Sequence, residues 1–388
     1  MQNKSKIAEL ATIKHGYAFE GQYFSEMEED YILLTPGNFH VDQKLYFGKN
    51  TKYYQGPIPS DYVLQNGDLL VVMTDLTKNM AILGNAVILE SQKPVLHNQR
   101  IGLVTIQNEH IDKQYLCYTL NSDLVRNTIK SSASGTTVRH TSPSKILDAK
   151  AWFPELPIQK KIAQILSTWD KAITTTEQLL ANSQQQKKAL MQQLLTGKKR
   201  LLDKNGVRFS GEWHRAELGT LLNYKQPTPY LVDSTDYDNN YSTPVLTAGK
   251  SFILGYTNEK HGIYQENLPV IIFDDFTTAS KFVDFEFKAK SSAMKILTAR
   301  KGVSINYVFE SMQMLNFKVG GHQRHWISIF SNLVIPVPIL EEQQKIAVVL
   351  SNADQEITAL QQKLNALKQE KKALMQQLLT GKRRVKIQ

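Results

Sequence analysis

Apolar residues recur with a 4,3,4,3 spacing over two long stretches of the chain, residues 162–194 and 346–378. Such a stripe predicts two long helices, each packed against another helix along a narrow apolar seam. At about 1.5 Å per residue, some 40 residues make a helix of roughly 60 Å. Pro157 fits the first turn of one helix, and Gly197 and Gly381 fit the position that ends each helix. The seam positions are Ile162, Leu166, Trp169, Ile173, Thr176, Leu180, Ser183, Lys187, Leu190 and Leu194, then Ile346, Leu350, Ala353, Ile357, Leu360, Leu364, Leu367, Lys371, Leu374 and Leu378.

The two helical stretches are copies of one segment. The letters KKALMQQLLTGK at 187–198 return unchanged at 371–382, and 26 of the 45 pairs from 154/338 to 198/382 are identical. The stretches before the copies hardly match each other, so we expect two divergent modules, each followed by a common helix. The nearest apolar partner for each helix is the other copy, which predicts antiparallel pairing within one chain and a pseudo-twofold repeat. A coiled coil between two chains is the alternative.

Short apolar runs bounded by Gly, Asn, Asp and Pro predict strands inside both modules. They are YILLT at 31–35, DLLVVM at 68–73, AVILE at 86–90, IGLVTI at 101–106, PVIIF at 269–273, KFVDFEF at 281–287 and AMKIL at 293–297, with a helix at about 111–130. The predicted class is α+β, with two globular domains joined by two long antiparallel helices that form an intramolecular coiled coil. The predicted boundaries are 1–153 and 201–335 for the modules, and 154–200 and 336–388 for the helical regions.

Composition supports two ordinary cores, since 41% of the residues are hydrophobic. No run of eighteen apolar residues occurs and the N-terminus lacks the apolar stretch of a signal peptide, so we expect a soluble, unexported, cytoplasmic protein with no membrane partner. The lone Cys117 forms no intramolecular disulfide and is expected in the core.

The net charge of +10 is confined to the repeats, because residues outside 156–200 and 338–388 contain 29 basic and 29 acidic side chains. Basic helices suit a polyanion, although a solvated helix face is also often charged.

Catalytic motifs are weak. LTGKKR, at the end of the first helical repeat, lacks the upstream glycine of a phosphate-binding loop and the Ser or Thr that would contact magnesium, and is interpreted as a helix end. His322 and His325 lack a third zinc ligand, so we expect no metal site. Asp274 or Asp275 with Glu286 and Lys288 resembles a nuclease-like set; the alternative is a strand whose solvent face carries Glu286 and Lys288, with Val283, Phe285 and Phe287 inward. We therefore predict no catalytic residues.

The order of modules and helices resembles the specificity subunit of type I restriction-modification systems. The resemblance lies in LPIQKKIAQILSTWDKAI and VPILEEQQKIAVVLSNADQEI at the helix starts, and in LMQQLLTGK at both helix ends. Within the modules, GDLLVVMTD, HNQRIGLV, LPVIIFDDFTTASKFVDFEF and SSAMKIL look like target-recognition domains.

The resemblance implies a non-catalytic subunit that reads a bipartite, asymmetric site in double-stranded DNA, one half per target-recognition domain. It implies docking of two methyltransferase subunits and of restriction subunits, which would bind S-adenosylmethionine, ATP and Mg²⁺. Two alternatives stay open: a system with a methyltransferase-nuclease fusion that cuts on both sides of its site, and a coiled-coil interaction scaffold that binds no DNA.

Loops rich in Arg, Lys, Asn, Gln, Thr and His are the predicted DNA contacts, although any of them can be plain loop surface. In the first module these are Thr74, Lys78, Asn79, Asn98, Arg100, Thr137, Arg139 and His140; in the second they are Lys250, Tyr256, Thr277, Thr278, Lys281, Gln323, Arg324 and His325. An Arg-His pair stands shortly before each long helix, at Arg139–His140 and again at Arg324–His325, which predicts equivalent loops.

Overall fold

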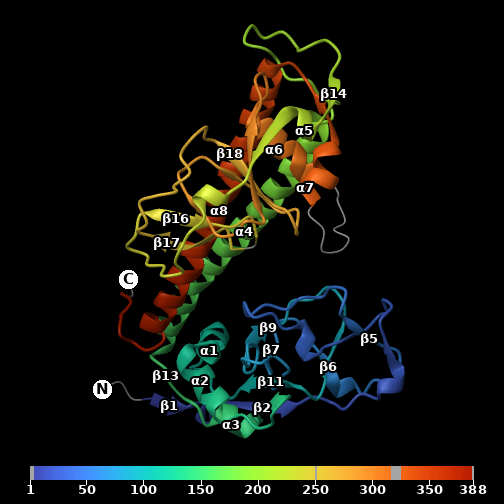
Figure 1. Ribbon diagram of the computed structural model, residues 1–388. Helices are drawn as coiled ribbons and strands as arrows, with labels where there is room; N and C mark the ends of the chain where they lie inside the picture. Colours follow the sequence, from blue (N-terminus) through green and yellow to red (C-terminus); the bar gives the residue numbers. More distant parts are fainter. Residues whose placement is uncertain (1–3, 250, 316–324, 387–388) are drawn as a thin grey trace. The chain divides into compact units, whose positions relative to one another are not determined.

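The computed structural model describes residues 4–249, 251–315 and 325–386 (Figure 1). The chain divides into two compact units: unit 1 comprises Met1–Thr176 and Lys363–Gln388, and unit 2 comprises Glu177–Gln362. Each unit therefore contains one module and one half of each long helix. The division between the compact units falls inside the helices, whereas the boundaries expected from the sequence lie where the helices start and end.

Unit 1 is built around a four-stranded antiparallel sheet in the order β2–β11–β7–β9. Its strands are β2 (Ala11–His15), β11 (Ile101–Ile106), β7 (Leu69–Val72) and β9 (Ala86–Ile88). All four side chains of β7 are buried: Leu69 and Val71 pack on one face and Leu70 and Val72 on the other. A continuous apolar run is what a strand covered on both faces requires.

The two faces of this sheet are covered differently. Helices α1 (Lys113–Leu120), α2 (Asp123–Ser131) and α3 (Pro143–Leu147) contribute to the core on one face. A five-stranded sheet contributes to the core on the other face, in the order β3 (Phe24–Ser25), β5 (Lys52–Tyr54), β4 (Ile32–Leu33), β10 (Val95–Leu96) and β6 (Val63–Leu64). Two short pairs, β1 (Lys4–Lys6) with β13 (Lys150–Trp152) and β8 (Thr74–Asp75) with β12 (Arg139–His140), complete the unit with the 3₁₀ turns η1 (Ile7–Glu9), η2 (Gly21–Tyr23), η3 (Pro36–Asn38) and η4 (Ser60–Tyr62).

Unit 2 repeats this plan. Its four-stranded sheet has the order β15 (Leu222–Lys225), β21 (Met294–Ala299), β18 (Val270–Asp274) and β19 (Ser280–Val283), and its second sheet has the order β17 (Ile253–Thr257), β16 (Thr243–Leu246) and β20 (Lys288–Ala289). Strand β14 (His214–Glu217) pairs with β22 (Val334–Val337) as β1 does with β13. The helical elements are α5 (Leu218–Leu221), η5 (Thr228–Tyr230), α6 (Ile305–Met314), α7 (His325–Ser328) and η6 (Phe330–Asn332).

The two long helices are α4 (Leu156–Leu194) and α8 (Leu340–Leu378), drawn side by side in green and red in Figure 1. Each is followed by a glycine in the left-handed region, Gly197 at φ 74° and Gly381 at φ 67°, as expected for a helix end. The start of one helix packs against the end of the other in each unit, so the pairing is antiparallel. All twenty seam positions predicted from the sequence are buried or half-buried. They include the fourteen larger apolar residues expected to pair the helices: Ile162, Leu166, Trp169, Ile173, Leu180, Leu190, Leu194, Ile346, Leu350, Ile357, Leu360, Leu364, Leu374 and Leu378.

A buried glutamine near the start of each long helix ties that helix to its module. Gln159, 1% exposed, accepts a hydrogen bond from the N–H of Asp112 (3.0 Å) and donates to the carbonyl of Pro154 (2.7 Å). In unit 2, Gln343 accepts from the N–H of Ser304 (2.9 Å) and donates to the carbonyl of Pro338 (2.8 Å). Buried amides need such partners, and here the partners are main-chain atoms. We call each arrangement a glutamine clamp.

Each clamp stands beside a buried tyrosine that also bonds main chain. The Tyr115 hydroxyl donates to the carbonyl of Trp152 (2.8 Å), and the Tyr307 hydroxyl donates to the carbonyl of Pro336 (2.7 Å). Burial raises the pKa of both phenols, so they stay hydrogen-bond donors. The two modules are thus attached by the same contacts despite their different sequences.

An ion pair crosses between the helices in each unit, with a different third residue. In unit 1, Lys371 lies 2.6 Å from Asp170, and the Tyr118 hydroxyl donates to the other oxygen of Asp170 (2.6 Å). In unit 2, Lys187 lies 2.5 Å from Asp354 and 3.0 Å from the carboxylate of Glu310. Burial raises the pKa of Glu310, against the opposing effect of Lys187.

Several sequence predictions of elements need correction. The helix expected at 111–130 is two helices, because Asn121 ends α1 and the Ser122 hydroxyl caps α2 by accepting from the N–H of Val125. The strand expected at 281–287 ends at Val283. Cys117 is buried, as predicted. Within the described ranges, none of the helices combines the length and the apolar content needed to cross a membrane.

Candidate nucleic-acid interface

The loop that follows β7 is anchored by the buried carboxylate of Asp75. One carboxylate oxygen accepts from the N–H of Thr77 (2.6 Å), and the other accepts from the N–H groups of Ile82 (2.6 Å) and Leu83 (2.9 Å). Asp75 is 0% exposed, and these three bonds supply the partners that a buried carboxylate needs. The backbone on both sides of residues 78–81 is therefore held in place.

Arg126 of α2 holds the far side of the same loop. Its guanidinium donates to the carbonyls of Ala81 (2.8 Å) and Leu83 (3.2 Å), and burial lowers its pKa against the opposing effect of the Asp75 carboxylate. Lys78 and Asn79 are exposed between these anchors. A basic and an amide side chain on a fixed backbone suit phosphate and base contacts in DNA.

Three segments distant in sequence meet beside this loop. Strand β12 pairs with β8, so that Arg139 lies opposite Asp75 and His140 opposite Thr74. The His140 Nδ1 atom is 3.1 Å from the Thr74 hydroxyl and 3.4 Å from the Arg100 guanidinium. Arg100 is exposed, and Arg139 is half-buried. Unit 1 thus brings Arg100, Arg139 and His140 together at the base of the anchored loop.

Unit 2 has a corresponding junction. The N–H of His325 donates to the carbonyl of Asp275 (3.0 Å), just after β18, as the N–H of Thr141 donates to the carbonyl of Met73 (2.9 Å), just after β7. The predicted equivalence of the two Arg-His pairs is wrong by one position, since the counterpart of His325 is Thr141 and not His140. Thr141 and His325 keep the same offset as the two helical repeats, because both connections run to the helix without a relative insertion.

The remaining predicted DNA-contacting residues divide by exposure. Thr137 and Thr277 are exposed, whereas Tyr256, Thr278 and Lys281 are half-buried. Thr74, Asn98 and His325 are 7%, 8% and 1% exposed, so these side chains support loops and offer little surface to a base edge. Lys250, Gln323 and Arg324 lie outside the described residues, as does His322. Tyr256 belongs to the second sheet of unit 2, whereas Thr277 and Thr278 lie in the turn between β18 and β19.

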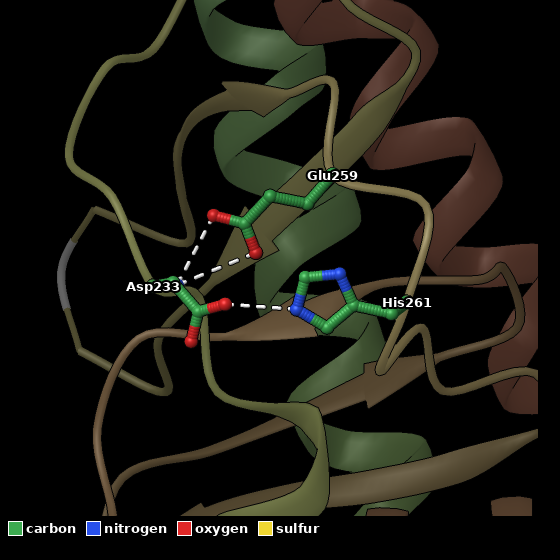
Figure 2. A group of neighbouring side chains, drawn as sticks. All are labelled: Asp233, Glu259 and His261. Atoms are coloured by element: carbon green, nitrogen blue, oxygen red, sulfur yellow. Dashed lines mark hydrogen bonds and ion pairs between the residues drawn. The ribbon is translucent and has the colours of Figure 1, made fainter.

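Figure 2 shows Asp233, Glu259 and His261, whose side-chain ligand atoms lie within 4.8 Å of one another. Glu259 already accepts from the N–H groups of Asp233 and Ser234 (3.1 Å each) and lies 2.5 Å from the ammonium of Lys288, which is 0% exposed. Although burial alone would raise the pKa of Glu259, these bonds lower it. The group is better explained by an ion pair that neutralises the buried Lys288, because the Glu259 carboxylate already bonds Lys288 and two main-chain N–H groups. The absence of a metal site stays a prediction.

The residues of the nuclease-like set form structural contacts with other partners. Asp275 lies 3.5 Å from Lys295, and both are about 1% exposed. Asp274 accepts from the N–H of Thr277 (2.7 Å) in a tight turn. Lys288 forms the ion pair with Glu259, so these groups serve structural pairs.

The alternative, an alternating strand, is also wrong in part. Lys288 is buried instead of facing solvent, and Phe285 is 36% exposed instead of facing inward. Phe287 is buried and Glu286 exposed, as predicted. The alternation fails because the chain leaves the four-stranded sheet after Val283 and joins the other sheet at β20.

Sequence reasoning missed the anchoring residues. Asp75 lies inside the predicted loop, but only the structure shows that its carboxylate organises that loop. A signal existed for the buried tyrosines: Asp112 and Ser304 each cap a helix and precede Tyr115 and Tyr307 by three residues.

Comparison with known proteins accounts for this architecture. The family model described as "Type I restriction modification DNA specificity domain" matches residues 2–182 and again 210–369. The chain belongs to this family. The resemblance inferred from the helix starts and ends is thereby confirmed.

Two relatives from Escherichia coli show the extent of the similarity. The chain is 49% identical over 174 residues to the type I restriction enzyme EcoR124I/EcoR124II specificity subunit, covering 44% of this chain and 41% of that protein. It is 27% identical over 238 residues to the EcoBI specificity subunit, covering 58% of this chain and 47% of that protein. The matched regions thus span less than half the length of these relatives.

Solved structures share the fold. The crystal structure of the type I restriction-modification S subunit from M. genitalium covers 98% of this chain and 96% of its own, with a TM-score of 0.68 at 15% identity. A structure from a study of type I complex assembly and conformational transition covers 98% of this chain with a TM-score of 0.53. At such low identity these matches show the fold alone.

Proposed function

We propose that this chain is the DNA-specificity subunit of a type I restriction-modification system. Units 1 and 2 each read one half of a bipartite, asymmetric site in double-stranded DNA. The observation that carries the proposal is the repeated plan: the same sheet, the same glutamine clamp and the same junction occur twice, while the loops at the junction differ. Two modules of one fold with different loops suit two different half-sites.

The loop after the central strand illustrates that difference. In unit 1 it runs from Met73 to Asn85 and is anchored by Asp75; in unit 2 a short turn joins β18 to β19 directly. The first loop presents Lys78 and Asn79 with Arg100 nearby, and the second presents Thr277. Because base edges differ in their donors, acceptors and methyl groups, such different loops favour different bases.

Catalysis belongs to the partners in this proposal. Two methyltransferase subunits that bind S-adenosylmethionine and restriction subunits that use ATP and Mg²⁺ would assemble on this chain. The chain itself would position the complex on the DNA, through sequence-independent contacts of Lys and Arg with phosphates and through contacts of the junction loops with bases.

Sequencing of methylated adenines in cells that carry the complete system tests the proposal. We expect one motif with two separated halves. Replacing residues 205–335 by the corresponding module of another family member should change one half only, and Arg100→Ala should relax only the other half. A change of both halves by either variant, or methylation at an unbroken motif, would overturn the assignment.

A further inference from the structure

Each unit exposes a large apolar side chain in the loop that follows its central strand. Leu76, in the loop after β7, is 71% exposed, and Phe276, in the turn after β18, is 42% exposed. Within the described parts of the chain, neither side chain belongs to a hydrophobic core of its unit. A single exposed apolar side chain is ordinary on a protein surface, so exposure alone indicates no function. The place of these two residues in the fold is the informative feature.

Both residues lie at the same point of the repeated plan. Met73 and Asp275 occupy corresponding positions, because each carbonyl accepts an N–H from the segment that leads to the next long helix. The N–H groups of the same two residues donate to carbonyls just before β11 and β21 (3.0 Å each). Leu76 follows Met73 by three residues, and Phe276 follows Asp275 by one. The loops differ in length and in their polar residues, yet both present an apolar side chain here.

An aspartate fixes the backbone of each turn. The Asp75 carboxylate accepts from the N–H of the second residue after it (2.6 Å), so that Leu76 is the central residue of a closed turn. The Asp274 carboxylate accepts from the N–H groups of Phe276 (3.0 Å) and Thr277 (2.7 Å). Such bonds close a turn without using the side chain of the residue inside it. Because the backbone is already ordered, a contact made by that side chain costs less entropy on binding.

Polar side chains that suit DNA accompany both apolar side chains. Lys78, Asn79 and Arg100 are exposed in the same junction as Leu76, and Thr277 is exposed next to Phe276. Arginine, asparagine and threonine match the donors and acceptors of base edges in the major groove. The apolar group that a base pair offers in that groove is the C5 methyl group of thymine. A side chain without hydrogen-bonding groups, placed among such residues, therefore matches thymine.

We propose that Leu76 and Phe276 each contact the C5 methyl group of a thymine, Leu76 in the half-site read by unit 1 and Phe276 in the half-site read by unit 2. This inference rests on the proposed function. It makes the two residues determinants of specificity, because cytosine carries no methyl group at this position. Insertion of the side chain between base pairs is the other use of exposed apolar residues in DNA-binding proteins, and it requires no thymine methyl group.

Deoxyuridine tests the contact without changing the protein, since it pairs as thymidine does and lacks only the methyl group. The duplex carries the motif found by methylation sequencing, and each thymine in turn is replaced by uracil. Fluorescence anisotropy measures the affinity of the complex of this chain with its methyltransferase subunits. We expect a loss of about fourfold at one thymine of each half, which corresponds to the burial of a single methyl group.

Alanine variants complete a double-mutant cycle between the protein and the DNA. Leu76→Ala should weaken binding to the thymine duplex, and uracil at the sensitive position should then cause no further loss. Phe276→Ala should abolish the effect of uracil in the other half only. Met27→Ala is the matched control, because Met27 is 75% exposed in unit 1 but follows β3, outside the junction. This control should leave the affinity and both uracil effects unchanged.

The outcomes separate this inference from the proposed function. Equal losses on the thymine and uracil duplexes in Leu76→Ala or Phe276→Ala would indicate insertion between base pairs and would overturn the methyl contact in that unit. Insensitivity of every thymine to replacement would overturn it in both units. In these cases a preference of the complex for its motif over an unrelated duplex leaves the proposed function intact. A complex without that preference would refute the proposed function and the inference together.

Discussion

Lys187 and Lys371 occupy the same position in the two helical repeats, yet the structure predicts unequal costs when either is replaced by methionine. Methionine keeps the apolar stem and removes the charge. In unit 2 this leaves Glu310, whose side chain is 6% exposed, without its cation. In unit 1 it leaves Asp170, which is 35% exposed and still accepts a hydrogen bond from Tyr118.

The size of the difference follows from protonation. Without Lys187, the buried Glu310 carboxyl takes up a proton. Keeping a group of ordinary pKa 4.5 neutral at pH 7 costs at most about 3 kcal/mol, at roughly 1.4 kcal/mol per pH unit. Glu310 already has a raised pKa, so a part of this cost is present before the substitution. We expect Lys187→Met to destabilise unit 2 by about 2–3 kcal/mol, and Lys371→Met to destabilise unit 1 by about 1 kcal/mol or less.

The sign of the pH dependence is a second test. The penalty of a raised carboxyl pKa disappears as the pH falls below the folded-state pKa toward the ordinary value of 4.5, so the penalty of Lys187→Met should shrink to below about 1 kcal/mol at pH 5. Hydrogen exchange of the α6 and α1 amides reports the two units separately. Adding Glu310→Gln to Lys187→Met should restore most of the loss. Equal costs at the two lysines, or a penalty that persists at pH 5, would refute the reasoning.

Three further outcomes follow from the described contacts. Gln343→Ala should lower the free energy of unfolding of unit 2 by about 2–4 kcal/mol, since it leaves a buried N–H and a buried carbonyl unpaired, whereas the exposed Gln185→Ala should stay within about 0.5 kcal/mol in the same denaturation experiment. Glu259→Gln should lower the free energy of unfolding by about 3 kcal/mol at pH 7, because it leaves the buried Lys288 unpaired. Since the pKa of Glu259 is lowered in the folded protein, this difference from the wild type is complete above pH 4.5 and disappears as the pH falls through the folded-state pKa. The control Glu266→Gln, in the exposed pair with Lys225, should change stability by less than about 1 kcal/mol. Lys78→Ala should reduce the slope of log affinity against log salt by about 1 in fluorescence anisotropy with duplex DNA, and an unchanged slope would remove Lys78 from the phosphate contacts.

The long helices were predictable because several signals agreed over many turns: the seam spacing and a terminal glycine in both helices, and a proline in the first turn of α4. The helix expected at 111–130 failed at Asn121 and Ser122, where two polar side chains end one helix and cap the next. Apolar periodicity continues through such a break and does not detect it. The central strands β7 and β18 were found because burial on both faces leaves a continuous apolar run.

The candidate interface was less predictable, because exposure depends on tertiary contacts. Composition selected Lys78, Asn79 and Arg100, whose side chains are exposed, but it also selected Asn98 and His325, whose side chains are buried. Lys288 illustrates the same limit: an alternating pattern assigns it to solvent, whereas Glu259, from an earlier segment of the chain, neutralises it in the interior. A pattern within one segment carries no information about such a partner.

The glutamine clamps bear on how new specificities can evolve. Gln159 and Gln343 form hydrogen bonds with a main-chain N–H and with main-chain carbonyls. Every amino acid has a main-chain carbonyl, and every amino acid except proline has a main-chain N–H. The clamp itself therefore places almost no demand on the side chains of the module that the helix holds. Mutation can explore the junction loops freely while the attachment persists, and an inherited helix can accept a foreign module whose chain reaches the same two main-chain groups.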